Sequence, residues 1–321
     1  MIRIGSRGSA LARWQAEHIA AQLRMQAHQV SIEILVTTGD RMQQAPFMQV
    51  GTKGMFTKEI EEALAEGRID LAVHSLKDWP TELPGNFVIA CIPERADARD
   101  AFVSIRYQHF AELPQGAVIG TSSLRRQAQL RALRPDLDVR ELRGNVDTRL
   151  RKLQNGQYDA IVLAAAGLDR LQQTEWVRER FSTLEMCPAA GQGALAIECR
   201  AGDVATRSVV AALDHAPTRF AVTLERSVLG TLEGGCHVPV GVYCGPMEAG
   251  WLVTAIVAHP DGSRILREQM HLDNADYSLA RAKDAGQAIA HRLLEQGAGG
   301  LLAIHETVPN PSQTSAGNTR A

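Results

Sequence analysis

In the first third of the chain, segments with the hydrophobic pattern of a strand alternate with segments that have the pattern of a helix. Short runs rich in β-branched residues are typical of strands, and longer segments repeat their apolar side chains with a helical period. The strands are expected at 2–6, 30–38, 69–76 and 87–93, and the helices at 7–26 and 56–67. Residues 69–76 are nearly all apolar, which indicates a buried parallel strand.

The same pattern begins again near residue 101. Strand–turn–helix units, or parts of them, are expected at 101–104, 117–135, 138–156 and 158–167. A further strand at 193–200 follows this second set and could return to the first sheet. The chain would then cross between two lobes twice.

The pattern changes after Gly234 and Gly235. Helices are expected at about 204–214 and 217–232 before this point and at about 277–296 after it. Between them lie strand-like runs with Asp261-Gly262 as a hairpin signal, which predicts a small antiparallel sheet. The last residues lack apolar content and are expected to be disordered.

These patterns predict an α/β fold class with two α/β domains and a small α+β domain at the C-terminal end. The expected boundaries are 1–95 with 194–212, then 99–190, then 216–306, followed by a tail at 307–321. Two α/β lobes side by side place a ligand cleft between them, beyond the carboxyl ends of their strands.

Composition narrows the class of partner. The 321 residues carry a formal net charge of -2, so no global positive field attracts nucleic acid or an anionic membrane. Aromatic residues make up only 5%, and no platform for stacking bases is visible. No apolar run approaches the roughly 20 residues of a membrane span. We therefore expect no nucleic-acid or membrane partner.

One of the five cysteines stands apart. Cys236 follows two glycines in a loop, where its sulfur would be accessible for covalent chemistry, although a structural role is an equal alternative. The others lie in or beside apolar stretches, where core packing is expected: Cys91, Cys187, Cys199 and Cys244. An odd number without metal-ligand spacing or a signal peptide favours reduced thiols in the cytoplasm.

In two segments, an expected strand ends and a helix that carries arginines begins. GTSSLRRQ (120–127) offers Ser123, Arg125 and Arg126, and RELRGNVDTRLRKL (140–153) offers Arg143 and Arg149. A helix N-terminus and guanidinium groups both favour anions. Each segment alone could equally be a capped helix with solvated arginines.

Two further segments add to this cationic set. IGSRGS (4–9) places Arg7 and Ser9 at a strand–helix turn, and GTKG (51–54) flanks Lys53 with glycines. We expect a cleft lined by cations and hydroxyls, with acids elsewhere, which suits a ligand with several carboxylates or phosphates. No nucleotide P-loop motif occurs.

AVHSLKDWP (72–80) supplies a carboxylate at a strand end. Lys77 and Asp78 emerge just before Pro80, where Asp78 could serve as an acid, a base or a counter-ion. Burial would raise the pKa of Asp78 and the arginines would lower it. Asp78 could also simply form the turn before proline.

Six segments together resemble the porphobilinogen deaminase (hydroxymethylbilane synthase) family, in the order of that family. They are VHSLKDWP, GTSSLRRQAQL, LRGNVDTRL, AAAGLDRL, AAGQGALAIE and ERSVLGTLEGGCHVPVG. The resemblance covers about residues 2–305. It implies two domains similar to type II periplasmic binding proteins, a third domain, and a cytoplasmic monomeric transferase of tetrapyrrole (heme) biosynthesis.

The resemblance also implies a chemistry. A dipyrromethane cofactor is held as a thioether on Cys236, and porphobilinogen loses ammonia to give an azafulvene that the growing chain attacks. Four such condensations and hydrolysis release hydroxymethylbilane. Asp78 is implied as the catalytic residue that steadies positive charge on the pyrrole nitrogen, an effect typically worth about 3–4 kcal/mol.

The remaining roles follow the motif positions. The residues implied to hold the cofactor carboxylates are Lys53, Lys77, Ser123, Arg125 and Arg126. Those implied to hold substrate and elongating rings are Arg7, Ser9, Gln15, Arg143, Arg149 and Arg170. The main alternative is a solute-binding or sensor module that closes two lobes on a dicarboxylate without reaction, which would leave Cys236 and the third domain unexplained.

Overall fold

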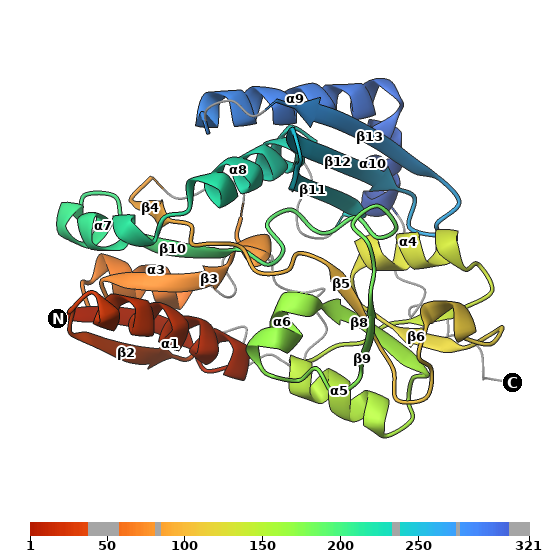
Figure 1. Cartoon of the computed structure of the whole chain (residues 1–321), viewed down its shortest axis with the longest axis horizontal. Coiled ribbons are helices and arrows are strands. Elements are labelled where there is room, and N and C mark those ends of the chain that lie inside the picture. The colour runs from red at the N-terminus through yellow and green to blue at the C-terminus, as the bar shows by residue number, and fades with distance from the viewer. Residues whose placement is uncertain (38–57, 81–84, 233–237, 274–276, 308–321) are drawn as a thin grey trace, which may run out of the picture.

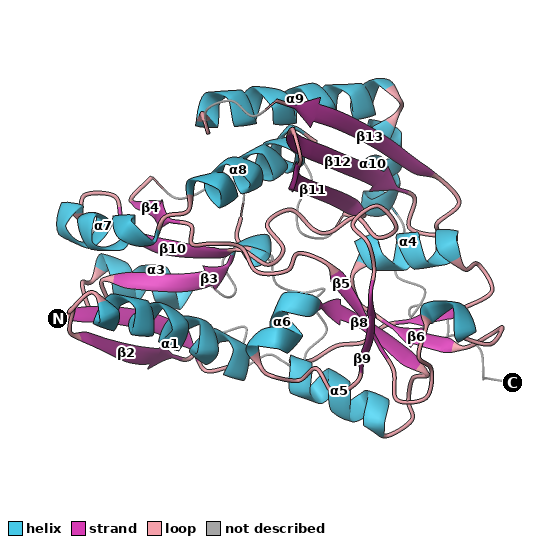
Figure 2. Ribbon diagram, in the orientation of Figure 1, coloured by secondary structure: helices cyan, strands magenta, loops and turns pink. Residues whose placement is uncertain are grey.

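The computed structural model describes residues 1–37, 58–80, 85–232, 238–273 and 277–307. Three β-sheets organise these residues, each covered by helices (Figures 1 and 2). Two are mixed sheets in α/β units, and the third is antiparallel. The predicted fold class, two α/β units with a small α+β unit, is confirmed. No helix in the described ranges has the length and apolar character needed to cross a membrane.

The first sheet has the strand order β2-β1-β3-β10-β4. Its strands are β1 (Ile2–Arg7), β2 (Val30–Leu35), β3 (Leu71–Ser75), β4 (Phe87–Cys91) and β10 (Leu195–Arg200). Its helices are α1 (Ala10–Met25), α3 (Lys58–Ala65) and α7 (Val204–Val210), with short 3-10 turns at Leu76–Asp78 and Ala211–Leu213. Apolar side chains of α1 and of α3 pack in two separate clusters with this sheet.

The second sheet has the order β7-β6-β8-β5-β9. Its strands are β5 (Asp100–Val103), β6 (Val118–Gly120), β7 (Asp138–Arg140), β8 (Ala160–Ala164) and β9 (Val177–Arg180). Its helices are α4 (Leu124–Leu133), α5 (Val146–Gln154) and α6 (Ala165–Arg170), and a 3-10 turn spans Phe110–Glu112. Strand β9 was not predicted because its sequence, VRER, has a single apolar residue.

The two α/β sheets share one topology. In each, the fourth strand in the order is antiparallel to both neighbours and comes directly after the chain has crossed from the other unit: β10 in the first sheet and β5 in the second. The expected return of residues 193–200 to the first sheet is thus confirmed.

The two crossing segments touch. The Ala96 backbone N–H donates to the Gly193 carbonyl at 3.2 Å, and a Cβ on residue 193 would lie 2.5 Å from the Ala96 carbonyl oxygen. Gly193 also has φ +86, a conformation that favours glycine. Both properties make glycine the residue that lets the crossings meet.

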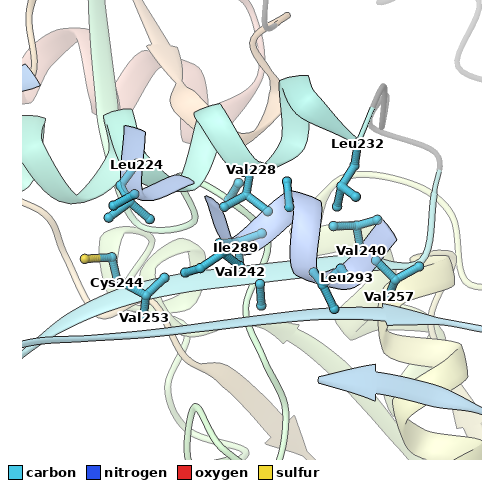
Figure 3. Close-up of a cluster of buried hydrophobic side chains, with 14 of the residues drawn as sticks. Leu224, Val228, Leu232, Val240, Val242, Cys244, Val253, Val257, Ile289 and Leu293 are labelled. Atoms are coloured by element: carbon cyan, nitrogen blue, oxygen red, sulfur yellow. The ribbon is translucent and has the colours of Figure 1, made fainter. Parts of the chain in front are cut away.

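The third unit packs helices against a three-stranded sheet of order β11-β12-β13. Its strands are β11 (Val240–Met247), β12 (Gly250–Ala258) and β13 (Ile265–Leu272), and its helices are α8 (Ala216–Thr231), α9 (Leu279–Glu295) and α10 (Ala298–Thr307). Leu224, Val242 and Ile289 belong to the core between helices and sheet (Figure 3). The Asp261-Gly262 hairpin is confirmed, with Gly262 at φ +80, whereas α10 was not predicted.

Candidate active site

The end of β3 carries the predicted catalytic turn. Residues Leu76–Asp78 form a 3-10 turn in which the Asp78 side chain is exposed and Lys77 is half-buried. Burial lowers the pKa of Lys77 to about 8, although the negative charge of Asp78 opposes this shift. Lys77 and Asp78 therefore form an electrostatically coupled pair at the strand end.

A small cavity joins this turn to the other two units. Its volume is about 70 Å³, room for a few water molecules or one carboxylate arm. Lys77 comes from the first unit, Ser123 and Arg125 from the second, and Val240 and Val242 from the third. Leu229 and Val238 also line it, and these two residues lie on either side of 233–237 in the sequence. Three predicted cofactor-binding residues thus meet in one cavity.

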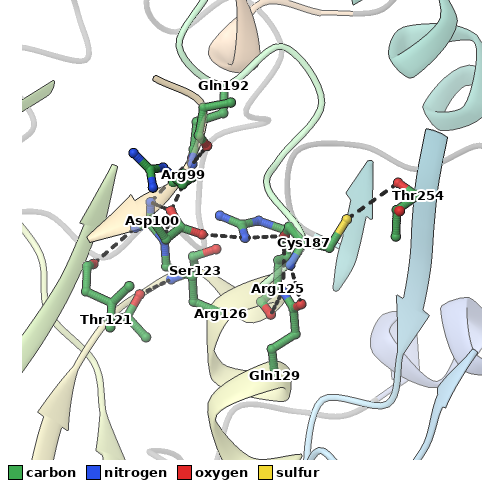
Figure 4. A network of polar contacts seen from close by, with 12 residues as sticks. Arg99, Asp100, Thr121, Ser123, Arg125, Arg126, Gln129, Cys187, Gln192 and Thr254 are labelled. Carbon is green, nitrogen blue, oxygen red and sulfur yellow. Dashed lines mark hydrogen bonds and ion pairs between the residues drawn. The ribbon is translucent and has the colours of Figure 1, made fainter. Parts of the chain in front are cut away.

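A buried carboxylate holds the arginines of α4. Asp100 Oδ2 accepts from Arg125 Nη1 at 2.7 Å, and Asp100 Oδ1 accepts from Arg126 Nη2 at 2.7 Å (Figure 4). Gln192 Nε2 also donates to Asp100 Oδ1 at 2.9 Å. Burial alone would raise the pKa of Asp100, but the two guanidinium groups hold it far below its usual range. The expectation that acids lie away from the cationic cluster is wrong here, because two buried arginines need a counter-charge.

Arg125 retains a free donor. Its Nη1 is bound by Asp100 and by the Cys187 carbonyl, but its Nε is buried and has no hydrogen-bond partner. Since buried polar groups are nearly always paired, this N–H fits an anionic group in the adjoining cavity. Arg126 is bound to Asp100 and to the Val162 carbonyl, and burial lowers its pKa.

Arg149 belongs to the same electrostatic group. Burial and the charge of Arg126 lower the pKa of Arg149 to about 10, while Asp78 opposes them. Its Nε donates to the Gly144 carbonyl at 2.6 Å, which closes the turn before α5. Arg143, in contrast, is exposed and pairs with Glu141 at 2.5 Å.

Arg170 connects the second unit to the second crossing and to α1. Its Nη2 donates to the Gly193 carbonyl at 2.7 Å, and its guanidinium lies 5.8 Å from the centre of the Trp14 ring. Burial lowers the pKa of Arg170 to about 10.

The other predicted substrate residues lie at the start of the first unit. Arg7 ends β1, and its charge helps to lower the pKa of His74 after the larger effect of burial. Ser9 caps α1 by accepting from the Ala12 N–H at 3.3 Å, and buried Gln15 donates to Ser75 Oγ at 2.8 Å. Ser9 and Gln15 therefore have structural partners of their own.

Two predicted cofactor residues, Lys53 and Cys236, lie outside the described residues. The four described cysteines are buried, as predicted. Burial raises the pKa of Cys91 and of Cys187 to about 12 and that of Cys199 to about 11, and it raises the pKa of Cys244 as well. These four thiols are thus held in the unreactive protonated form.

The sequence did not single out Asp100, Gln192 or Glu225. All three are fully buried: Gln192 binds Asp100 beside the arginines of α4, and Glu225 binds Arg95 in the first crossing. The sequence offers no clear signal for them: Asp100 directly precedes the apolar run AFV, but an acidic residue is usually exposed.

The family models and the curated relatives that match this chain agree on one family. The dipyromethane cofactor binding domain of porphobilinogen deaminase matches residues 2–208, and the C-terminal domain of porphobilinogen deaminase matches residues 219–295. Porphobilinogen deaminase of Chromobacterium violaceum is 49% identical over 304 residues, which covers 94% of this chain and 97% of that protein. The enzyme of Syntrophotalea carbinolica is 46% identical over 312 residues, with 97% and 98% coverage.

A solved nutrient binding protein from Burkholderia cenocepacia, bound to methionine, is far less similar. It shares 14% identity with a TM-score of 0.42, over 68% of this chain and 94% of that one.

Proposed function

The chain belongs to the porphobilinogen deaminase family, and on this basis we propose how its residues divide the work of the reaction. It is a transferase that condenses four porphobilinogen molecules with loss of ammonia on a dipyrromethane cofactor and releases hydroxymethylbilane by hydrolysis, in heme and tetrapyrrole biosynthesis. The non-catalytic binding module is not favoured, since both family domains match this chain.

We assign the anchoring of the cofactor to Cys236 and to the cavity between the three units. The thioether would form at Cys236, and Lys77, Ser123 and Arg125 would hold the carboxylates, with Lys53 and Arg126 as further cations. The unpartnered Nε of Arg125 is the observation that supports this fit. When bound, the cofactor supplies the terminal pyrrole carbon to which the first substrate is joined.

Asp78 would stabilise positive charge on the pyrrole nitrogen of the reacting unit. Its exposed side chain lies beside Lys77, and its charge acts on Arg126 and Arg149, whereas Asp100 is buried and already bound to Arg125 and Arg126. Arg149 and Arg170 would bind carboxylates of substrate and product, together with Arg7 and Arg143. Ser9 and Gln15 would act by holding α1 and the end of β3 in place.

The convergence of Lys77, Ser123 and Arg125 on one cavity, flanked by the segments that lead to Cys236, carries this proposal. The test is incubation with porphobilinogen, following ammonia release and bilane formation. The intact mass of active protein should exceed that of the bare chain by two pyrrole units. Cys236→Ala should have the bare mass and make no bilane, whereas Cys91→Ala should retain the added mass. Active protein at the bare mass would refute the covalent cofactor.

We also propose that the protein acts as a monomer in the cytoplasm, with the domain boundaries given by the sequence patterns. The domain boundaries are supported by the two family matches, which end at residue 208 and begin at residue 219, near the expected start of the third domain. Sedimentation of the active protein would test the monomer.

A further inference from the structure

A histidine and a glutamate that the proposed mechanism does not use form a buried pair beneath the Asp78 turn. His74 Nε2 lies 3.0 Å from Glu198 Oε2, and their side chains are 10% and 0% exposed. In the antiparallel pairing of β3 and β10, His74 is opposite Ala196 and Glu198 is opposite Ala72. The two side chains are therefore diagonal neighbours on one face of the sheet.

The surroundings of the pair disfavour charge on either member. Glu198 Oε1 is buried without a hydrogen-bond partner, and an ionised carboxylate in that position would be strongly destabilised. Glu61 on α3 adds negative charge near both side chains, and Arg7 on β1 adds positive charge near His74. Burial and Glu61 raise the pKa of Glu198 to about 8, and burial lowers the pKa of His74 to about 3. The neighbouring thiol of Cys199 is neutral.

The pair supports the residue that follows Asp78. The His74 ring centre lies 3.9 Å from that of Trp79, which is only 2% exposed. Trp79 Nε1 has no hydrogen-bond partner, so ring packing fixes its orientation. Arg226 on α8 also holds this turn, because it donates to the carbonyls of Trp79 and Pro80 at 3.1 and 2.5 Å.

We propose that Glu198 is a positioning residue: its protonated carboxyl donates a hydrogen bond to His74 Nε2 and thereby fixes the Trp79 ring and the Asp78 turn. The hydrogen bond sets the His74 tautomer, with Nε2 as acceptor. His74 then presents a neutral ring to Trp79. The kinetic part of this inference rests on the proposed role of Asp78, whereas the protonation of Glu198 does not.

Protonation is tested directly by infrared spectroscopy of the full chain with ¹³C-labelled glutamate at pH 7. Wild type should show a carboxylic acid C=O band that disappears in Glu198→Gln and persists in Glu62→Gln, a matched change of an exposed glutamate on α3. A band absent from wild type, or still present in Glu198→Gln, would overturn the proposal.

Stability gives a second readout that does not depend on turnover. Because the folded pKa of Glu198 is raised, the native state holds this proton up to about pH 8 while the unfolded state releases it near pH 4. The stability of wild type therefore falls across this window. In Glu198→Gln this fall should be smaller, and an unchanged pH dependence would contradict a protonated Glu198.

Kinetics test positioning. Glu198→Gln keeps a donor to His74 and should retain kcat, whereas Glu198→Leu should lose about 10-fold or more through misplacement of the turn, with the cofactor mass unchanged. Equal rates in both variants would remove the positioning role. If wild type made no bilane, the proposed function would fail, but the infrared result would still decide the protonation of Glu198.

Discussion

The carboxylate of Glu225 on α8 accepts two hydrogen bonds from the guanidinium of Arg95, at 2.6 and 3.1 Å. Arg95 lies in the first crossing, so this buried pair fastens that crossing to the third unit. Glu225 also accepts from the backbone N–H groups of Gly191 and Cys244, and Arg95 Nε donates to the Gln192 carbonyl. One carboxylate thus connects both crossings to β11.

Glu225→Gln should strongly destabilise the fold, because it leaves the Arg95 charge buried without its counter-ion. We expect a loss of about 3–5 kcal/mol in the free energy of unfolding, measured by urea denaturation. Glu33→Gln is the control: its pair with Arg68 is exposed, and its loss should cost about 0–1 kcal/mol. Equal urea denaturation midpoints for the two variants would show that the buried pair stabilises the fold no more than the exposed pair does.

Asp100→Asn should flatten the acid dependence of stability. The folded pKa of Asp100 is lowered, so its contribution is complete above the unfolded value near pH 4 and is lost as the pH falls below it. Below about pH 4, the free energy of unfolding in urea should fall more steeply with decreasing pH for wild type than for the variant. At pH 7, wild type should be the more stable protein. Parallel curves from pH 7 to pH 3 would contradict the low pKa.

Asp78→Asn should fold and carry the cofactor but lose most turnover. One well-placed electrostatic group is typically worth about 10²–10³ in kcat, and the amide cannot stabilise a positive ring nitrogen as the carboxylate does. The measurements are the intact mass and the rate of bilane formation. Asp138→Asn, an exposed acid paired with Arg140 elsewhere in the second unit, should keep the normal rate. A near-normal rate for Asp78→Asn would remove it from the mechanism.

The Lys77 ammonium should titrate near pH 8 in cofactor-free Cys236→Ala protein. Since Asp78 raises this pKa, adding Asp78→Asn should move the midpoint to lower pH. The chain has only five lysines, so ¹³C NMR of labelled lysine can follow them all, with Lys77→Arg as the assignment control. A midpoint that stays fixed or rises in Asp78→Asn would contradict the stated effect of Asp78 on the Lys77 pKa.

The hydrophobic pattern predicted most of the fold, because buried helices repeat apolar residues every three to four positions and buried strands are short apolar runs. It failed at β9, where three of four residues are charged, and at α10, whose sequence begins AGG. In both, packing against neighbouring elements outweighs local preference.

The candidate site was predictable where side chains follow strand ends, as for Lys77, Ser123 and Arg125. Its buried partners were not. Asp100 and Glu225 resemble exposed acids in sequence, and only tertiary contact shows that they neutralise Arg125, Arg126 and Arg95. Cys236 and Lys53 remain predictions.

Residues from all three units line the cavity beside Lys77, with Ser123 from the second unit and Val240 from the third. A rigid rotation of any single unit would separate part of that wall from the rest. The cavity therefore keeps its shape only while the three units keep their mutual orientation. If the cofactor carboxylates are held here, as we propose, the growing product would have to be accommodated outside this cavity.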